Sequence, residues 1–453
     1  MKRFRSVALA GALILAAIIV IFNINSCQPD KTGDIKTGNV IFIHPDGSGP
    51  SMWAALRIYQ YGPDSLSGWD RMRSMGLYRS HVLNSTNSSS HAGATIHSYG
   101  VKVKFNTYGS CPEKPVRSLS GNDFSIMTEA KKAGIATALI NSGHICEPGT
   151  GVFVAGAERR SNSDYISEQI INSGTDIIFS GGETLLIPEG EVGRHGEPGI
   201  RKDGRNLIEE AERLGYTVVY DRDEMMALPA DAEKVLGVFA PRHTFNAHTE
   251  EYNKEHDLPE YRRDAPSLDE MTRTALRILD RKGKQFFMVV EEEGTDNFGN
   301  SNNARGVFAA LKRADLAIGT AIDYAEEKGN TLVITAADSD AGGMQLISVR
   351  DQSSWEEPVP DIADNGSPVD GVSGKNTIPF RAAPDKNGNR LRFCVSWACY
   401  DDVAGSIIAR AHGVNAHLMK NNLDNTDIYR IMYATLFGRM LPSCNPLLED
   451  MPY

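Results

Sequence analysis

The sequence lacks any run of lysine or arginine that would form a basic stripe, and its formal net charge is −11. This acidic balance argues against binding to a nucleic-acid backbone, which needs clustered positive charge. Cysteine is scarce, with six residues, and no CxxC pair indicates a thiolate metal site. Cys394 and Cys399 are close enough in sequence to form a disulfide bond, but their spacing does not establish one. Most acidic residues are expected on a solvated surface, whereas local clusters of carboxylates are candidate metal ligands.

One apolar run, from Val7 to Phe22, follows the basic segment Lys2–Arg5. It is short for a membrane span, and it leads into Ser26-Cys27, the small residue and cysteine typical of a bacterial lipoprotein cleavage site. We therefore expect a signal peptide over residues 1–26, a lipidated Cys27 that anchors the chain to the membrane, and a tether over 27–37. The alternative is an uncleaved anchor helix. Both arrangements predict an exported protein, periplasmic or at the cell surface.

Beyond the tether, apolar segments of strand type alternate with segments of helical periodicity. The expected strands are 39–43, 136–140, 176–180, 217–220, 286–291 and 331–335, and the expected helices begin near 164 or span 203–214, 267–279 and 303–327. This alternation predicts a doubly wound α/β fold with a mostly parallel central sheet and helices on both faces. One domain is expected over 38–440, with an inserted crown-like loop region at 344–400, and a C-terminal tail follows at 441–453.

Three acidic residues, Asp46, Glu291 and Asp338, each close an expected strand. The carboxyl ends of parallel strands meet at one edge of a sheet, where polar groups for chemistry gather. A carboxylate that ends a strand is often only a turn or helix cap. Three such residues, each followed by a loop of Gly, Asn or Ser, predict a functional site.

Small residues from Ser88 to Gly100 are predicted to open a helix, where free backbone N–H groups and the helix dipole favour an anion. A serine nucleophile there needs activation, because the pKa of its free hydroxyl is far above 7. No G-x-S-x-G elbow surrounds Ser90, which argues against a Ser-His-Asp triad. The neighbouring His91 points elsewhere on a helix and is interpreted as structural. Metal coordination is the other way to ionise a serine.

These features together resemble the alkaline phosphatase family over nearly the whole mature chain. The similar segments are Asn39–Gly49, Ser98–Lys102, Asp203–Ala211, Gly237–Arg242, Pro266–Thr272, Gly329–Ile334 and Asp424–Ile428. The resemblance implies an enzyme that hydrolyses phosphate monoesters through a phosphoserine intermediate. It also implies a site for two zinc ions and a magnesium ion, small phosphorylated substrates, and a homodimer as the common assembly.

The resemblance assigns roles to seven residues of this chain. Ser90 takes the position of the nucleophile, and Arg160 that of an arginine whose planar fork clamps phosphate. Arg159 is the alternative in that segment, and the other interpretation of Arg160 is a surface arginine. The matching metal positions are those of the bridging Asp46, Glu147 and Glu291 near magnesium, Asp296 in the first metal site and Asp338 in the second.

The three zinc-binding histidines of the family are absent from this chain. Asn300, Ser339 and Asp402 stand in their places, with Asp401 as an alternative to Asp402. Oxygen donors favour Mg²⁺ or Ca²⁺ over Zn²⁺, and hard cations can still ionise a serine and neutralise phosphate. The expected ligand groups are Asp46, Ser90 and Asp338 with Ser339 or Asp340; Asp296, Asn300 and Asp402; and Asp46, Glu147 and Glu291.

Two other functions are compatible with this sequence. The first is a non-catalytic surface lipoprotein that binds metal or phosphoesters and has lost turnover together with its histidines. The second is an enzyme of the same fold that acts on a phosphodiester, a phosphonate or a sulfate ester. Decay would leave apolar or random residues more often than oxygen donors at every ligand position, which favours the phosphomonoesterase.

Overall fold

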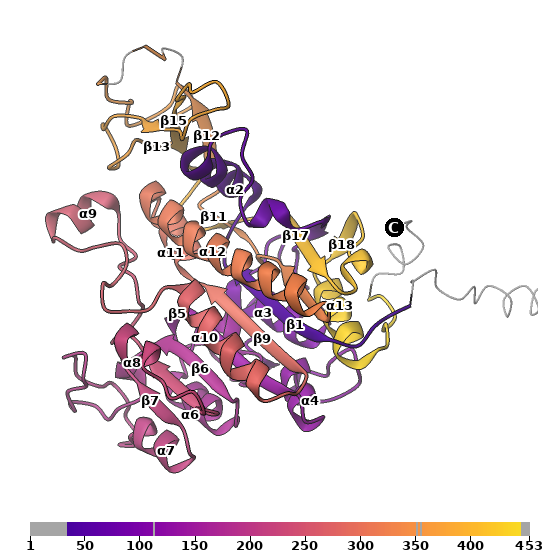
Figure 1. The fold of residues 1–453 in the computed structure, drawn as a ribbon. Helices are drawn as coiled ribbons and strands as arrows, with labels where there is room; N and C mark the ends of the chain where they lie inside the picture. Colours follow the sequence, from indigo (N-terminus) through magenta and orange to yellow (C-terminus); the bar gives the residue numbers. More distant parts are fainter. Residues whose placement is uncertain (1–33, 112–113, 350–351, 354–355, 445–453) are drawn as a thin grey trace, which may run out of the picture. The chain divides into compact units, whose positions relative to one another are not determined.

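The computed structural model describes residues 34–111, 114–349, 352–353 and 356–444 of the chain (Figure 1). The predicted signal peptide, Cys27 and most of the predicted tether lie outside these residues, as does most of the predicted C-terminal tail. Within the described ranges, no helix is both long and apolar enough to cross a membrane. From Lys36 onward the chain forms one compact unit.

A ten-stranded sheet forms the centre of this unit, in the order β18-β2-β17-β10-β1-β9-β5-β6-β8-β7. The seven strands from β10 to β7 in this order pair in parallel, whereas β17 is antiparallel to both of its neighbours. This arrangement confirms the predicted α/β class. The strands are β1 (Asn39–Pro45), β2 (Ser74–Arg79), β5 (Ala136–His144), β6 (Ile177–Gly181), β7 (Thr217–Val219), β8 (Val235–Val238), β9 (Phe286–Glu292), β10 (Thr331–Thr335), β17 (Ser406–Gly413) and β18 (Asn422–Asp424).

Short strands outside the central sheet form three small sheets. One of them lies within the predicted crown-like region 344–400 and contains β12 (Gln345–Ser348), β13 (Val369–Asp370), β14 (Phe380–Arg381) and β15 (Arg392–Ser396). The other two pair β11 (Asp340–Ala341) with β16 (Asp402–Val403), and β3 (Ser110–Cys111) with β4 (Lys114–Pro115). Cys394 and Cys399 are both free thiols.

The helices connect the strands and cover the sheet (Figure 1). They are α2 (Pro50–Leu56), α3 (Ser90–Tyr99), α4 (Ile126–Lys132), α5 (Pro148–Gly151), α6 (Ser163–Asn172), α7 (Leu207–Arg213), α8 (Arg222–Met226), α9 (Glu250–Glu255), α10 (Leu268–Arg281), α11 (Gly294–Asn300), α12 (Ala304–Lys328) and α13 (Thr426–Phe437). Local sequence sets several of these boundaries: Ser267 and Glu270 form a capping box at the start of α10, and the Asn303 side chain caps α12.

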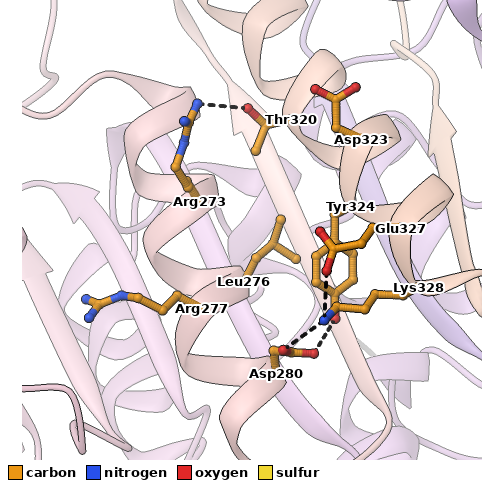
Figure 2. Close-up of a pocket in the computed structure, with 9 residues that line it drawn as sticks. All are labelled: Arg273, Leu276, Arg277, Asp280, Thr320, Asp323, Tyr324, Glu327 and Lys328. Atoms are coloured by element: carbon orange, nitrogen blue, oxygen red, sulfur yellow. Dashed lines mark hydrogen bonds and ion pairs between the residues drawn. The ribbon is translucent and has the colours of Figure 1, made fainter.

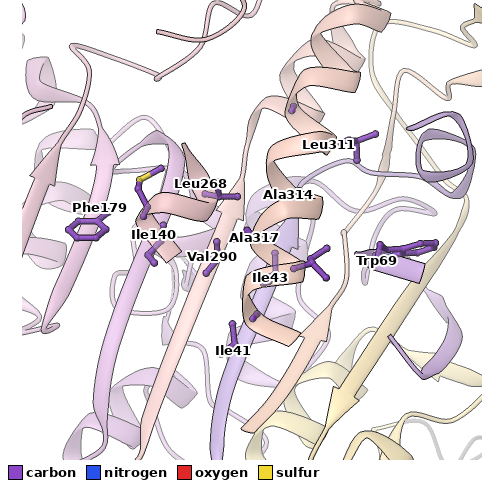
Figure 3. Packing of buried hydrophobic residues seen from close by; sticks show 14 of the residues in the cluster. Ile41, Ile43, Trp69, Ile140, Phe179, Leu268, Val290, Leu311, Ala314 and Ala317 are labelled. Carbon is purple, nitrogen blue, oxygen red and sulfur yellow. The ribbon is translucent and has the colours of Figure 1, made fainter. Parts of the chain in front are cut away.

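The alternation of side chains along β1 determines which residues point to each face of the sheet. Ile41 and Ile43 point into the core beneath α10 and α12, where Leu311, Ala314 and Ala317 pack against them (Figure 3). Phe42 points the other way, toward Phe153 and His97 of α3. His44 and Asp46 follow Phe42 with the same period of two, so they emerge on the α3 side at the strand's carboxyl end.

The helix predicted over 203–214 is shorter in the structure and begins only at Leu207. Asp203 accepts hydrogen bonds from Arg201 and from the backbone N–H of Arg205, which holds this segment in a turn. The side chain of Asn206 then caps the backbone N–H groups of Ile208 and Glu209. These local hydrogen bonds from Asp and Asn compete with helical ones, and the prediction for residues 203–206 was therefore wrong.

Candidate active site

The candidate site lies where the carboxyl ends of neighbouring parallel strands meet. β1 pairs with β9 so that His44 lies opposite Glu291, and β9 pairs with β5 so that Glu291 also lies opposite Asn141. Asp46 follows β1 directly, and Asp338 follows β10, the strand on the other side of β1. The three acidic residues predicted to end strands are therefore gathered at one edge of the sheet.

Asp46 is fully buried and lies at the centre of this cluster. Its carboxylate comes within 4.8 Å of His44 and Glu291 on one side, and of Glu293 and Asp296 on the other. Both of its oxygens lack a hydrogen-bond donor among the described residues. A fully buried carboxylate without a partner is costly, so this position requires a cation or a proton.

A second group joins Asp296, Asn300 and Asp402, the residues expected to share one metal ion. The side-chain amide of Asn300 donates to Asp296 Oδ1 at 3.1 Å and to Asp402 Oδ1 at 3.2 Å. Its carbonyl oxygen accepts from the backbone N–H of Gly342 at 3.1 Å, which fixes the orientation of the amide. Asp401 instead accepts from the backbone N–H of Asp402 and does not take part in this group.

Asp338, Ser339 and Asp340 are all buried beside this group. The Ser339 hydroxyl donates to Asp338 Oδ1 at 3.4 Å, whereas the other oxygen of Asp338 and Oδ1 of Asp340 have no donor in the described part of the chain. Asp340 packs so closely against Gly49 that a Cβ on the glycine would lie 2.2 Å from the carboxyl carbon. Only glycine allows this approach.

Ser90 is the first residue of α3, and Ser89 caps the helix by accepting a hydrogen bond from the N–H of Ala92. One turn further along, Gly93 packs against Asp338, where an added Cβ would lie 2.3 Å from the Asp338 Cβ. The first turn of α3 therefore lies against the carboxylate cluster. Ser90 is 7% exposed, and its hydroxyl makes no hydrogen bond with any described residue. The hydroxyl is thus available for chemistry.

Arg160 forms an ion pair with Glu147 through Nη2 and Oε2. The charge of Glu147, followed by the charges of Glu293, Asp46 and Asp296, raises the pKa of Arg160 above its usual value. The guanidinium is therefore a permanent cation within the field of the cluster, as a phosphate clamp requires. Its side chain is 40% exposed, so it can reach a ligand that enters from solvent.

Glu147 was expected to share a magnesium ion with Asp46 and Glu291, but its nearest potential ligands are two histidines. His144 Nε2 lies 2.9 Å from Glu147 Oε1, and His243 Nε2 lies 3.9 Å from the same oxygen. Glu291 is approached instead by α5, since it accepts from the backbone N–H of Gly149 at 3.0 Å and from the Thr150 hydroxyl at 3.3 Å.

His44 lies directly beside Asp46. Its Nδ1 lies 2.7 Å from the carbonyl oxygen of Ala336, and its Nε2 lies 3.2 Å from Asp46 Oδ1. Donation from Nδ1 to the carbonyl leaves a lone pair on Nε2 that faces the carboxylate. A metal-binding histidine is typically oriented in this way by its second nitrogen. Either a proton or a metal ion must lie between two such electron-pair donors.

The pKa values of the cluster show how strongly it needs positive charge. Burial raises the pKa of Glu291 to about 8, and burial together with Asp402 raises that of Asp340 to about 7. Burial also raises the pKa values of Asp296 and Asp338, and the charge of Asp46 adds to this effect. Without cations these groups hold protons near neutral pH. Divalent ions would replace the protons, and the oxygen-rich set of donors fits them.

Sequence reasoning missed His44, Glu293, Thr150, His144 and His243. Two of these had a readable signal: His44 lies two residues before Asp46 on the same strand face, and Glu293 follows Glu291 with the same spacing. His144 and His243 are 99 residues apart, as their numbers give (243 − 144). Only the parallel packing of β5, β6 and β8 brings them together, so no local pattern could have identified them.

A different hollow lies on the outer surface between α10 and α12, with a volume of about 410 Å³ (Figure 2). Its charged side chains are paired or exposed: Lys328 Nζ lies 3.2 Å from both Asp280 and Glu327, and Arg277 is exposed. Figure 2 shows these residues on the helices rather than at strand ends. This groove is therefore a solvated helix surface without the unpartnered groups that mark the cluster.

Comparison with known proteins agrees with this geometry. A family model described as alkaline phosphatase matches residues 37–437. The alkaline phosphatase of Escherichia coli is 26% identical over 70% of this chain and 73% of its own length, and alkaline phosphatase 4 of Bacillus subtilis is 25% identical over 90% of both. The repressible alkaline phosphatase of Saccharomyces cerevisiae is 27% identical over 69% of this chain, but the match spans only 56% of that protein.

Solved structures share the fold at lower identity. The alkaline phosphatase of Thermus thermophilus has a TM-score of 0.68 at 20% identity, covering 91% of this chain and 95% of its own. That of the Antarctic bacterium TAB5 has a TM-score of 0.66 at 19% identity, covering 89% and 100%. The resemblance read from the sequence is confirmed. The chain belongs to the alkaline phosphatase family of metal-dependent phosphomonoesterases.

Proposed function

We propose that this protein hydrolyses small phosphate monoesters through a phosphoserine formed on Ser90, at a cation cluster built mainly from oxygen ligands. The observation that carries the proposal is the fully buried, unpartnered Asp46 carboxylate, surrounded by further acidic groups beside the first turn of α3. Such an arrangement needs cations or protons to balance its charge. The same cations would lower the pKa of a neighbouring hydroxyl and neutralise phosphate oxygens.

The chain's own residues divide the remaining work. The Arg160 fork binds two oxygens of the phosphate and orients it toward Ser90. The Ser90 oxygen attacks phosphorus, the bond from phosphorus to the ester oxygen breaks, and the alcohol leaves. Water then attacks the phosphoserine, which releases phosphate and restores the Ser90 hydroxyl. The backbone N–H groups at the start of α3 favour the anionic group throughout.

Three groups of residues would hold the cations. Asp296 and Asp402 would hold one ion beside the Asn300 amide, whose nitrogen faces both carboxylates, and Asp338 would hold a second with Asp46, Ser90 and either Ser339 or Asp340. Asp46 and Glu291 would hold a third, with His44 as a nitrogen donor in place of Glu147. The oxygen donors favour Mg²⁺ or Ca²⁺ over Zn²⁺ in the first two sites. A mutant of the TAB5 enzyme has been solved with magnesium bound in its M3 site.

Export and membrane attachment through Cys27 belong to the same proposal, although those residues lie outside the described part of the chain. An exported phosphatase would act on phosphorylated small molecules outside the cytoplasm. The homodimer expected from the family is also retained as a proposal, and it is tested by the mass of the purified protein in solution.

Turnover of p-nitrophenyl phosphate with added Mg²⁺, Ca²⁺, Mn²⁺ or Zn²⁺ tests the proposal. We expect activity with a hard cation, no activity in Ser90→Ala, and a phosphoserine that can be trapped on Ser90 by acid quenching. Ser89→Ala is the matched control, because it removes a neighbouring hydroxyl and should still be phosphorylated. Bound metal without turnover would instead support the non-catalytic lipoprotein. Faster turnover of bis-p-nitrophenyl phosphate would support a diesterase.

A further inference from the structure

Two imidazoles and a carboxylate converge beside the carboxylate cluster, at the carboxyl ends of β5 and β8. His144 is the last residue of β5, Glu147 is the N-cap residue of α5, and His243 lies in the loop after β8. Both imidazoles direct Nε2 at the same oxygen, Oε1 of Glu147, and the three atoms all lie within 4.8 Å of one another.

The distances suit a shared ion better than a set of hydrogen bonds. His144 Nε2 lies 2.9 Å from Glu147 Oε1, but His243 Nε2 lies 3.9 Å away, which is too far for a hydrogen bond. Ligand atoms around one tetrahedral ion, each bonded at about 2.0–2.2 Å, are separated by roughly 3.3–3.6 Å. The two observed distances bracket this value, so small rotations of the side chains would complete the site.

The surroundings hold the two rings in place and leave their Nε2 edges accessible. The ring centroids of His144 and His243 are 4.9 Å apart, and His243 also stacks on Phe245 at 5.0 Å. Nδ1 of each histidine is buried without a hydrogen-bond partner in the described ranges, so stacking alone orients the rings, and Nε2 is the nitrogen that faces Glu147. About a quarter of each imidazole side chain is exposed, which gives an ion a path from solvent.

We propose that His144, Glu147 and His243 bind one first-row transition-metal ion, with zinc as the best match, at a site separate from the oxygen-ligated cluster. Two imidazole nitrogens and one carboxylate oxygen form a donor set typical of zinc, and the solvent-facing side leaves a fourth position open. The oxygen-only groups around Asp296 and Asp338 prefer harder cations. The chain would therefore carry two kinds of metal site about one edge of its sheet.

This site would also position the phosphate clamp, a consequence that rests on the proposed function. Glu147 offers Oε1 to the imidazoles and Oε2 to the Arg160 guanidinium. A metal ion on Oε1 would fix the carboxylate and, through it, the arginine. His144 and His243 are then positioning residues that act on phosphate binding through Glu147 and Arg160.

Cobalt substitution of the full-length protein tests the site. We expect the wild type to bind one Co²⁺ ion that gives visible absorption bands and is displaced by Zn²⁺. His243→Gln should lose these bands and bind Zn²⁺ at this site at least 10–100-fold more weakly, as loss of metal-site residues typically does. His256→Gln removes an exposed imidazole at the C-cap of α9 and should behave like the wild type. Identical bands and zinc affinity in all three proteins would overturn the proposal.

A second measurement does not depend on the folding of a variant. Pulsed electron paramagnetic resonance of the wild type loaded with one equivalent of Cu²⁺ should show coupling to two imidazole nitrogens, whereas a spectrum without imidazole coupling contradicts the site. Kinetics then separate the two proposals. If turnover depends on Ser90 but no metal ion is lost in His243→Gln, this inference alone is overturned. If a metal ion is lost in His243→Gln but the wild type has no turnover, the proposed function alone is overturned. If both hold, His243→Gln should raise KM for phosphate esters more than it lowers kcat.

Discussion

Two adjacent glutamates at the end of β9 are equally buried but have opposite surroundings. Glu292 faces α12, where the Arg313 guanidinium donates to both of its oxygens at 3.0 and 2.8 Å and the Ser142 hydroxyl donates to it at 2.9 Å. Glu291 faces the α3 side, among Asp46 and other acidic groups. One face of the strand therefore carries a satisfied ion pair, and the other carries charge that the chain does not neutralise.

This difference shows which buried carboxylates serve stability and which serve function. Asp315 belongs with Glu292, since it accepts hydrogen bonds from Tyr61, Gly68 and Trp69 at 2.7–3.0 Å. A paired buried carboxylate holds elements together, and removing its partner is strongly destabilising. An unpaired cluster is retained against its cost to folding because it binds cations. Burial and hydrogen-bond donors therefore do not identify a functional carboxylate, since Glu291 also accepts from Asn141, Gly149 and Thr150. The crowding of several carboxylates around Asp46 does.

The largest effect is expected from Asp46→Asn. It removes the carboxylate common to both sides of the cluster, so kcat/KM should fall by about 10³-fold or more, which is roughly 4 kcal/mol of transition-state stabilisation. The metal-free variant should lose much less stability than Glu292→Gln, because neither oxygen of Asp46 makes a hydrogen bond with a described residue. Steady-state kinetics and urea unfolding in chelator measure the two quantities. A large loss of stability in the metal-free variant would show that Asp46, like Glu292, mainly stabilises the fold.

Glu292→Gln should have the opposite profile. Breaking the buried pair leaves the Arg313 charge without its partner, which should lower the free energy of unfolding by about 3–5 kcal/mol. The kcat of the folded molecules should change little, because Glu292 faces away from the cluster. Arg222→Met is the matched control: Arg222 pairs with Glu270 but is 46% exposed, so its loss should lower the free energy of unfolding much less. Equal losses in both variants would contradict the comparison.

The elements that carry the cluster are predictable from sequence, because they depend on local patterns. Continuous apolar runs predict β1, β9 and β10, and the caps at Ser267 and Asn303 predict the helices that cover them. Once these strands are placed, the acidic residues at their carboxyl ends are identified as well. The antiparallel pair of β2 and β17 carries no comparable signal, since it joins segments more than three hundred residues apart.

The contacts within the site are less predictable than its location. The resemblance places Glu147 beside magnesium, yet the side chain lies nearest His144, His243 and Arg160. The direction of a side chain at a loop depends on packing between distant strands, which sequence spacing does not report. His44 illustrates the reverse case: sequence reasoning missed it, although its position two residues before Asp46 is enough to place it on the same strand face.

Removal of metal should make the free energy of unfolding depend on pH, because the carboxylates of the cluster then bind protons. In the metal-free protein the pKa of Glu291 is raised to about 8 and that of Asp340 to about 7. The folded state then holds more protons than the unfolded state between roughly pH 4.5 and 8. Its stability should therefore fall as pH rises through that range, by up to about 1.4 kcal/mol per pH unit for each group.

Saturating Mg²⁺ should flatten this slope, because cations ionise the same carboxylates when they bind. Urea unfolding at a series of pH values, with chelator or with Mg²⁺, measures both curves, and Asp46→Asn in chelator serves as the matched variant. A metal-free protein whose stability is constant from pH 5 to 8 would show that the cluster is neutralised by some other means.

The smallest effect concerns Glu250, which lies at the start of α9 and outside the cluster. Burial and then the charge of Asp370 raise the pKa of Glu250 to about 8, while its Oε1 accepts from the backbone N–H of Arg305 at 3.1 Å. This single group should make the folded protein less stable as pH rises from about 4.5 to 8, by at most about 1.4 kcal/mol per pH unit. Glu250→Gln keeps an acceptor for Arg305 and should remove this contribution with metal present, whereas the exposed Glu255→Gln on the same helix should not. If Glu250→Gln leaves the pH dependence of stability unchanged, the buried Glu250 carboxyl has a partner that stabilises its charge, as Glu292 has.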